Sequence, residues 1–233
     1  MIEESDEGIT HTITSDLGKD IYKFKLNGEV ITVTLFKTGQ QKLLLQGKNN
    51  YLFHIITATI IELFDNSQVE KILGSAYRIN IEKDVVSSAY NPIENGLPNN
   101  YPIGLKRLIK QSIINMTYYV ESEEYTMYVF PALRALEGHI KYLITEAGGN
   151  PGRQFGCFTK DGISGRYVVT ESFPDISKNG SIEKCYNYYK SQRDTIFHFG
   201  DIIGQIDNTR FIDTKETADE IIKECLSLII AEQ

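Results

Sequence analysis

Two side chains near the C-terminal end of the sequence have the types that phosphodiester chemistry needs. Arg193 and His198 are separated by four residues, in a stretch whose apolar spacing predicts a helix. An imidazole titrates near neutral pH and can move a proton onto or off a ribose oxygen, while a permanently charged guanidinium holds the phosphate that gains charge. The spacing alone is weakly specific, so the elements that position the two residues decide its meaning.

Arg193 and His198 do not share one face of an ideal helix. At about 100° per residue they lie about 140° apart. Both can line a single cleft if a second helix crosses the first, as in a two-fold dimer in which each copy supplies its pair. This geometry predicts a homodimer, with Tyr186, Tyr189 and the apolar surface of the same helix as the interface. The alternative is a structural arginine paired with Asp194 or Asp201.

A carboxylate in an earlier helix is the second irregular feature. Glu137 lies close to an apolar stripe, where an unpaired charge is costly. It either forms a surface ion pair with Lys141 or Arg134, or it holds Arg193 in one bidentate geometry. Both interpretations stay open, and Glu137 joins Arg193 and His198 as a candidate catalytic residue.

Other side chains near these positions have less specific chemistry. Tyr186, Tyr188 and Tyr189 could stack on RNA bases, although a tyrosine-rich helix is more often core; Tyr189 is the candidate substrate-binding residue. His139 is expected to be a partly exposed core histidine and His54 to pack on the N-terminal helix, while His11 falls in the N-terminal tail.

The bulk composition describes a globular chain of 233 residues with a formal net charge of -7. Residues 1–20 carry six acidic side chains and one lysine, whereas residues 21–101 carry eight basic and seven acidic ones. RNA affinity must therefore come from a shaped site and not from a basic surface.

No apolar run reaches the roughly 18 residues of a membrane span, and the acidic N-terminus lacks the regions of a signal peptide, so a cytoplasmic protein is expected. The three cysteines lack metal-ligand spacing, and Cys185 and Cys225, which fall on apolar stripes, are expected to be reduced core residues.

The N-terminal part predicts a small α+β unit at residues 21–90, after an acidic flexible tail at 1–20. Residues 21–36 alternate as a β-hairpin around Asn27-Gly28, a type I′ turn pair. A third strand is expected at 42–46, a helix at 51–64 across the sheet, and a strand at 77–81.

Residues 91–102 read NPIENGLPNNYP, and their many Asn, Pro and Gly residues predict a linker without regular structure. Beyond the linker the apolar period changes to that of helices over residues 103–233. Four helices are expected, starting near residues 103, 127, 181 and 213, and the third runs to about residue 204. A hairpin is expected at Asp161-Gly162, and Asp213 and Glu216 are expected to form a capping box.

Four helices with R-x4-H in the third resemble the HEPN superfamily of RNases. With the preceding small domain, the chain is similar to the RNase LS-type toxins, the RnlA/LsoA family. The segments that carry this resemblance are KLLLQGKNNYLFHIITATI (42–60), FPALRALEGHIKYL (130–143) and YYKSQRDTIFHFGD (188–201). The chain departs from longer members in having room for only one N-terminal α/β repeat. The resemblance implies an α+β protein, a TATA-binding-protein-like sheet-plus-helix domain followed by an all-α HEPN bundle.

The same resemblance implies a function. The protein would be an endoribonuclease toxin of a toxin–antitoxin or anti-phage system, held by a cognate antitoxin and acting without a metal or another cofactor. Attack by the ribose 2′-hydroxyl would use His198 as general acid or base and Arg193 as the phosphate stabiliser. Asp194 would orient the substrate, and Glu137 matches the acid that this toxin group has on its second helix.

Two other functions remain open at this stage. One is a catalytically silent HEPN module that binds a nucleotide or a partner, and the presence of both Arg193 and His198 disfavours it. The other is a nucleic-acid-binding regulator, which the near-neutral charge of residues 21–101 disfavours. The N-terminal domain is interpreted as a module for substrate positioning, dimer support or antitoxin contact.

Overall fold

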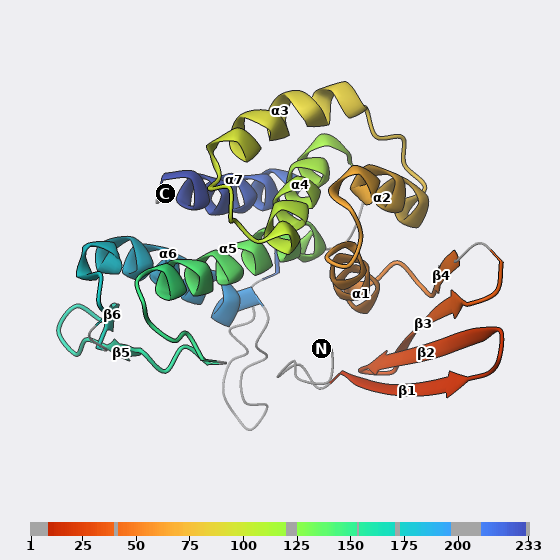
Figure 1. Cartoon of the computed structure of the whole chain (residues 1–233), viewed down its shortest axis with the longest axis horizontal. Coiled ribbons are helices and arrows are strands. Elements are labelled where there is room, and N and C mark those ends of the chain that lie inside the picture. Colours follow the sequence, from red (N-terminus) through yellow and green to blue (C-terminus); the bar gives the residue numbers. More distant parts are fainter. Residues whose placement is uncertain are drawn as a thin grey trace.

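A sheet at one end of the molecule and a helical bundle at the other make an α+β protein, as predicted (Figure 1). The computed structural model describes residues 9–39, 42–119, 125–152, 154–170, 173–196 and 211–231. No helix within these ranges is long and apolar enough to span a membrane.

The sheet is an antiparallel meander in the order β1-β2-β3-β4. Its strands are β1 (Thr10–Ser15), β2 (Lys19–Leu26), β3 (Glu29–Phe36) and β4 (Lys42–Gln46). The predicted hairpin is confirmed: Leu26 pairs with Glu29, and Asn27 and Gly28 have φ of 47° and 83°. Two successive left-handed residues are what a type I′ turn requires.

The sequence interpretation missed the first strand. All of β1 pairs with β2, so the prediction of a flexible tail at residues 1–20 is wrong for residues 10–20. The segment THTITS alternates β-branched residues, which suit a pleated sheet, but its acidic surroundings outweighed this pattern in the prediction.

Helix α1 (Tyr51–Ile61) covers one face of the sheet, and Asn50 caps it by accepting from the Phe53 backbone N–H at 3.0 Å. Between helix and sheet lies an apolar cluster whose buried members are Ile9, Phe24, Leu26, Ile31, Val33, Leu52, Phe53, Ile55, Ile56 and Ile60. Figure 1 shows α1 between the sheet and the other helices.

Residues 66–102 differ most from the prediction. A 3-10 turn (Asn66–Gln68) leads into α2 (Val69–Tyr77), and no strand forms at 77–81. Helix α3 (Lys83–Gly96) runs through the first half of the predicted linker, with Pro92 inside it. Its Val86 and Tyr90 are buried in the core of the helical part, and this burial outweighs the poor helix propensity of the Asn, Pro and Gly residues.

The C-terminal bundle consists of α4 (Ile103–Thr117), α5 (Thr126–Glu146), α6 (Asn179–Ile196) and α7 (Lys215–Ala231). Helix α5 is central because α4, α6 and α7 all pack on it. Between α5 and α6 the chain forms the expected hairpin of β5 (Phe158–Lys160) and β6 (Tyr167–Val169), then a 3-10 turn (Ile176–Lys178). Cys185 and Cys225 are buried and reduced, as predicted, and so is Cys157.

The ends of two predicted helices, the start of the fourth and the end of the third, compare differently with the structure. The N-cap of α7 is Thr214, whose Oγ1 accepts from the Thr217 backbone N–H at 3.2 Å, so the predicted capping box of Asp213 and Glu216 is wrong. The predicted third helix extends to residue 204, and its last part falls outside the described residues, which include α6 only to Ile196.

Charged side chains join the sheet-bearing part to the bundle. Arg134 on α5 forms an ion pair with Glu62 at the end of α1, and Arg107 on α4 donates to the Glu62 carbonyl oxygen. Lys110 pairs with Glu70 of α2 at 2.7 Å, with both side chains about nine-tenths buried. Because an unpaired buried charge is costly, these contacts fix the orientation of α1 and α2 on the bundle.

Candidate functional site

Glu137 and Tyr189 face each other across the α5–α6 contact. The chain leaves α5 and returns as α6, with the Asp175 backbone N–H donating to the Ala147 carbonyl at 3.1 Å, so α6 runs back along α5. The Tyr189 hydroxyl, on a side chain only 6% exposed, donates a hydrogen bond to the Glu137 carboxylate. Burial and the Glu137 charge raise the pKa of Tyr189, so its hydroxyl stays a donor at all physiological pH values.

Arg193 lies one helical turn beyond Tyr189 on the same face of α6. The positive charge of Arg193 lowers the pKa of the Tyr189 and Tyr186 phenols. It therefore opposes the increase that burial causes. Burial is the main cause of that increase for Tyr186, whose pKa rises to about 12. Arg193 is itself half-buried, and it lies close enough to Tyr186 and Tyr189 for its charge to act on both phenols.

Lys141 adds a second cation to this cluster. Its Nζ lies 2.7 Å from Glu137 Oε1 and 5.3 Å from the centroid of the Phe155 ring. Phe155 comes from the segment between α5 and β5, and its ring also packs against Tyr186 and Tyr189. Its φ of 53° is unfavourable for a side chain of this size, and burial of the ring holds the backbone there. We call Glu137, Lys141, Tyr189, Arg193 and Phe155 the α5–α6 cluster.

The α5–α6 cluster bears on both interpretations of Glu137. The predicted ion pair with Lys141 is present, and Arg134, the other predicted partner, pairs with Glu62. Glu137 also binds Tyr189, which lies beside Arg193. The carboxylate thus joins α5 to the arginine helix through Tyr189 while it pairs with Lys141.

The remaining candidates on α6 lie as follows. Asp194 pairs with Lys190 at 2.9 Å along the helix. Tyr186 is buried and stacked on Phe158, with ring centroids 3.8 Å apart. Because Tyr186 and Tyr189 are both covered within the chain, the prediction that they supply a dimer interface is wrong. His198 lies outside the described residues.

His54 belongs to packing, as predicted, and His139 lies in the core but without the partial exposure predicted for it. His139 is fully buried and its Nδ1 is 3.0 Å from the Tyr101 hydroxyl. His54 stacks on Tyr77, with Nδ1 2.6 Å from the Tyr77 hydroxyl, and burial lowers its pKa to about 3. His11, expected in a tail, lies on β1 near the Phe24 ring.

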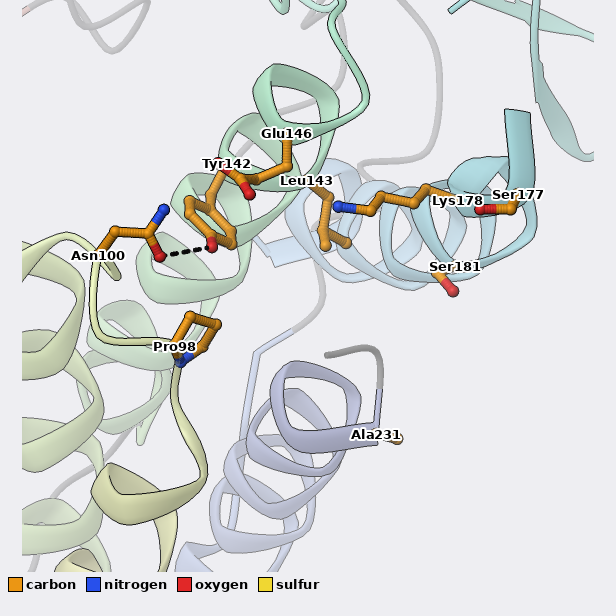
Figure 2. A pocket seen from close by; sticks show the side chains of 9 residues that line it. All are labelled: Pro98, Asn100, Tyr142, Leu143, Glu146, Ser177, Lys178, Ser181 and Ala231. Carbon is orange, nitrogen blue, oxygen red and sulfur yellow. Dashed lines mark hydrogen bonds between the residues drawn. The ribbon is translucent and has the colours of Figure 1, made fainter. Parts of the chain in front are cut away.

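A separate pocket of about 340 Å³ opens at the far end of α5 and α6 (Figure 2). Its lining residues are Pro98, Asn100, Tyr142, Leu143, Glu146, Ser177, Lys178, Ser181 and Ala231. The Tyr142 hydroxyl donates to the Asn100 side-chain oxygen at 3.3 Å. Glu146 lies nine residues, or about 14 Å of helix, from Glu137, so this pocket is distinct from the α5–α6 cluster.

Comparison with known proteins identifies the family. The family described as "RNase LS, bacterial toxin DBD domain" matches residues 82–200, and "RNase LS, bacterial toxin" matches residues 1–65. The first match covers half of the chain and includes the whole α5–α6 cluster. The chain therefore belongs to the RNase LS bacterial toxin family.

Two relatives extend this finding. The mRNA endoribonuclease LsoA of Escherichia coli O157:H7 is 25% identical over 209 residues, which are 83% of this chain and 58% of that protein. The chain thus spans less than two thirds of that relative's length. The fold is similar to the crystal structure of the Escherichia coli toxin LsoA in complex with the T4 phage antitoxin Dmd, with a TM-score of 0.60, 21% identity, and coverage of 98% of this chain and 89% of that one.

Proposed function

We propose that this protein is an endoribonuclease toxin of the HEPN type, active as a homodimer in anti-phage defence and restrained by a cognate antitoxin protein. The observation that carries the proposal is the α5–α6 cluster, in which a carboxylate and a buried phenol lie beside the arginine of the R-x4-H motif. Family membership and the likeness to a relative named mRNA endoribonuclease support the same activity.

In the proposed reaction the ribose 2′-oxygen attacks the adjacent phosphorus and the 5′-oxygen leaves. His198 takes the proton from the 2′-hydroxyl or gives one to the leaving oxygen. Arg193 donates to the non-bridging oxygens, which gain negative charge in the transition state. The products are a 2′,3′-cyclic phosphate and a 5′-hydroxyl, and no cofactor takes part. Asp194, held by Lys190, orients the substrate beside Arg193.

Glu137 and Tyr189 act on Arg193 and not on the reacting atoms. At 6% exposure the Tyr189 ring offers no face on which a base could stack, so its contribution to substrate binding is indirect. Its hydroxyl is fixed by Glu137, and the two together set the polar environment of the guanidinium. An arginine held in one geometry loses less conformational entropy when it binds a phosphate.

Cleavage is expected to proceed unchanged in EDTA and to leave 2′,3′-cyclic phosphate or 3′-phosphate ends. The reason is that His198 and Arg193 take the roles that metal ions fill in two-metal nucleases. The measurement is cleavage of end-labelled RNA with and without EDTA, followed by phosphatase treatment of the product ends. A strict Mg²⁺ requirement, or products that end in a 3′-hydroxyl, would contradict the proposed chemistry.

Glu137→Gln and Tyr189→Phe are each expected to lower kcat about tenfold with little change in KM, since both leave Arg193 present but less well oriented. Lys141→Gln is the matched control, because it removes a partly exposed ion pair, worth about 0.3–0.5 kcal/mol, and the cation over the Phe155 ring, but leaves the Glu137 and Tyr189 side chains unchanged. Thermal unfolding of all three variants checks that they fold. Equal and small kinetic effects from the three changes would reduce Glu137 to a surface ion-pair partner.

A partner protein that covers α5 and α6 would block this site without any chemistry of its own. The related toxin LsoA has been crystallised with the T4 phage antitoxin Dmd. We propose the same kind of control here, by a protein antitoxin.

A further inference from the structure

The β1–β4 sheet has one face that no described element covers. Strand residues alternate between the two faces, and the register places Phe24, Leu26, Ile31 and Val33 against α1. The opposite face is formed by Thr10, Thr12, Thr14, Lys19, Ile21, Lys23, Lys25, Val30, Thr32, Thr34, Phe36, Lys42, Leu44 and Gln46. We call these residues the open face. In Figure 1, α1 and the bundle lie on one side of the sheet.

The side chains of the open face are mostly accessible. Lys23, Lys25 and Lys42 are exposed, and so are the three threonines of β1. Val30 and Leu44 are 45% and 37% exposed, so the face also carries accessible apolar surface. A face of this kind is open to a partner.

The charges of the sheet are sorted between its two faces. The open face carries four lysines, and none of its positions holds a carboxylate. Asp20 points to the other side and pairs with Lys37 at 2.6 Å, while Asp16 lies in the β1–β2 turn, near Lys19. The almost neutral net charge of residues 21–101 hides this separation, because the acids lie elsewhere in the segment.

The register places the lysines next to groups that suit a nucleic acid strand. Lys19, Phe36 and Lys42 are neighbours across β2, β3 and β4, so a partly exposed aromatic ring lies between two cations. Two rows further along, Lys23 lies between the hydroxyls of Thr12 and Thr32. Cations and hydroxyls bind phosphates, and an aromatic ring provides a stacking platform for an unpaired base.

We propose that the open face binds single-stranded RNA and guides it to the toxin. The proposal rests on the proposed function, because RNA is the substrate assigned there. Lysines contact the phosphates, threonine hydroxyls contact phosphate or ribose oxygens, and Phe36 stacks on one base. Four strands give a surface about 14 Å wide and about 26 Å long, which fits a short single strand.

A duplex fits this surface less well than a single strand. The sequence-independent contacts of double-stranded RNA span two grooves, whereas one aromatic ring flanked by lysines needs an unstacked base. An acidic protein is the other polyanion that could bind four lysines. Only the nucleic acid uses the ring of Phe36 as a stacking partner.

The test compares binding of a labelled single-stranded 2′-O-methyl RNA of about twelve nucleotides to variants of the full chain, by fluorescence anisotropy across a salt series. The 2′-O-methyl group removes the attacking hydroxyl, so binding is measured without cleavage. The main variant is Lys23→Gln/Lys25→Gln/Lys42→Gln. Its matched control, Lys71→Gln/Lys83→Gln/Lys223→Gln, removes three exposed helix lysines and changes the net charge equally.

The open-face variant is expected to lower the slope of log Kd against log salt by about 2, since each phosphate contact on a single strand contributes about 0.7. The electrostatic contribution vanishes near 1 M salt, where the variant and the wild type should bind equally. At about 0.1 M salt the Kd of the variant should then be roughly a hundredfold higher than that of the wild type. Arginines at the same three positions should retain the slope. Phe36→Leu keeps an apolar side chain and should weaken binding about fivefold through lost stacking.

The outcomes separate this proposal from the proposed function. Equal Kd values and slopes for the open-face variant and its control would overturn RNA binding by the open face, even if the wild type cuts RNA. Loss of binding in the open-face variant would support it, even if the chain proved unable to cut RNA. Equally strong competition by poly-glutamate of the same charge, with no effect of Phe36→Leu, would assign the face to an acidic protein instead.

Discussion

Arg193→Ala and His198→Ala are each expected to lower the rate of RNA cleavage by about two to four decades and to abolish toxicity in cells. In the proposed reaction Arg193 supplies the positive charge for the phosphoryl oxygens, and His198 moves the proton. Neither change should unfold the protein: Arg193 is a half-buried residue near the C-terminal end of α6, beyond the closely packed row of Tyr186 and Tyr189. The measurement is single-turnover cleavage of labelled RNA, with thermal unfolding as the check on folding.

Two further variants make this test more specific. Arg193→Lys keeps the charge but loses the fork that binds two phosphate oxygens, so its activity should lie between those of wild type and Arg193→Ala. Lys184→Ala removes an exposed cation from the same helix and should cut RNA at the wild-type rate. Cleavage at the wild-type rate by Arg193→Ala or His198→Ala would show that the active site lies elsewhere.

The parts of the fold that followed from the sequence are those in which local and tertiary preferences agree. The β2–β3 hairpin has both strict alternation and the Asn27-Gly28 pair, and both survive in the structure. The segment of α3 has opposing signals: Pro92 and several asparagines argue against a helix, yet Val86 and Tyr90 are buried in the bundle core. That contact depends on residues distant in sequence, so no local pattern could reveal it.

The residues of the candidate site also fall into two groups, those that the sequence indicates and those that only the structure reveals. Glu137 and Arg193 were found from the sequence because polar residues beside an apolar stripe are costly without a partner. The role of Tyr189 was not found from the sequence, because a sequence does not show that the Tyr189 hydroxyl on α6 points at Glu137 on α5. Phe155 was missed entirely: it lies in the irregular segment after α5, and only its packing on Tyr186 brings it to the cluster.

A mixed dimer of an Arg193→Ala chain and a His198→Ala chain is expected to recover about half of the wild-type activity. On one helix Arg193 and His198 lie about 140° apart, so they converge on one phosphate most easily when two copies cross near a two-fold axis. In the mixed dimer one cross-chain pair remains intact and the other is lost. Each parent homodimer lacks one member of both pairs, so the mixture should exceed either parent by about two decades.

The structure restricts how such a dimer can form. Tyr186 and Tyr189 face Phe155, Phe158 and α5, so they hold the arginine helix in place within one chain, and the interface must use other residues. The complementation test is therefore more specific, because neither parental substitution removes Phe155, Tyr186 or Tyr189, whose rings pack together beside α6. Differently tagged chains should be co-purified, so that only mixed dimers are measured. Activity no greater than that of the parents, or full wild-type cleavage by a chain that sediments as a monomer at the assay concentration, would show that each copy carries a complete site.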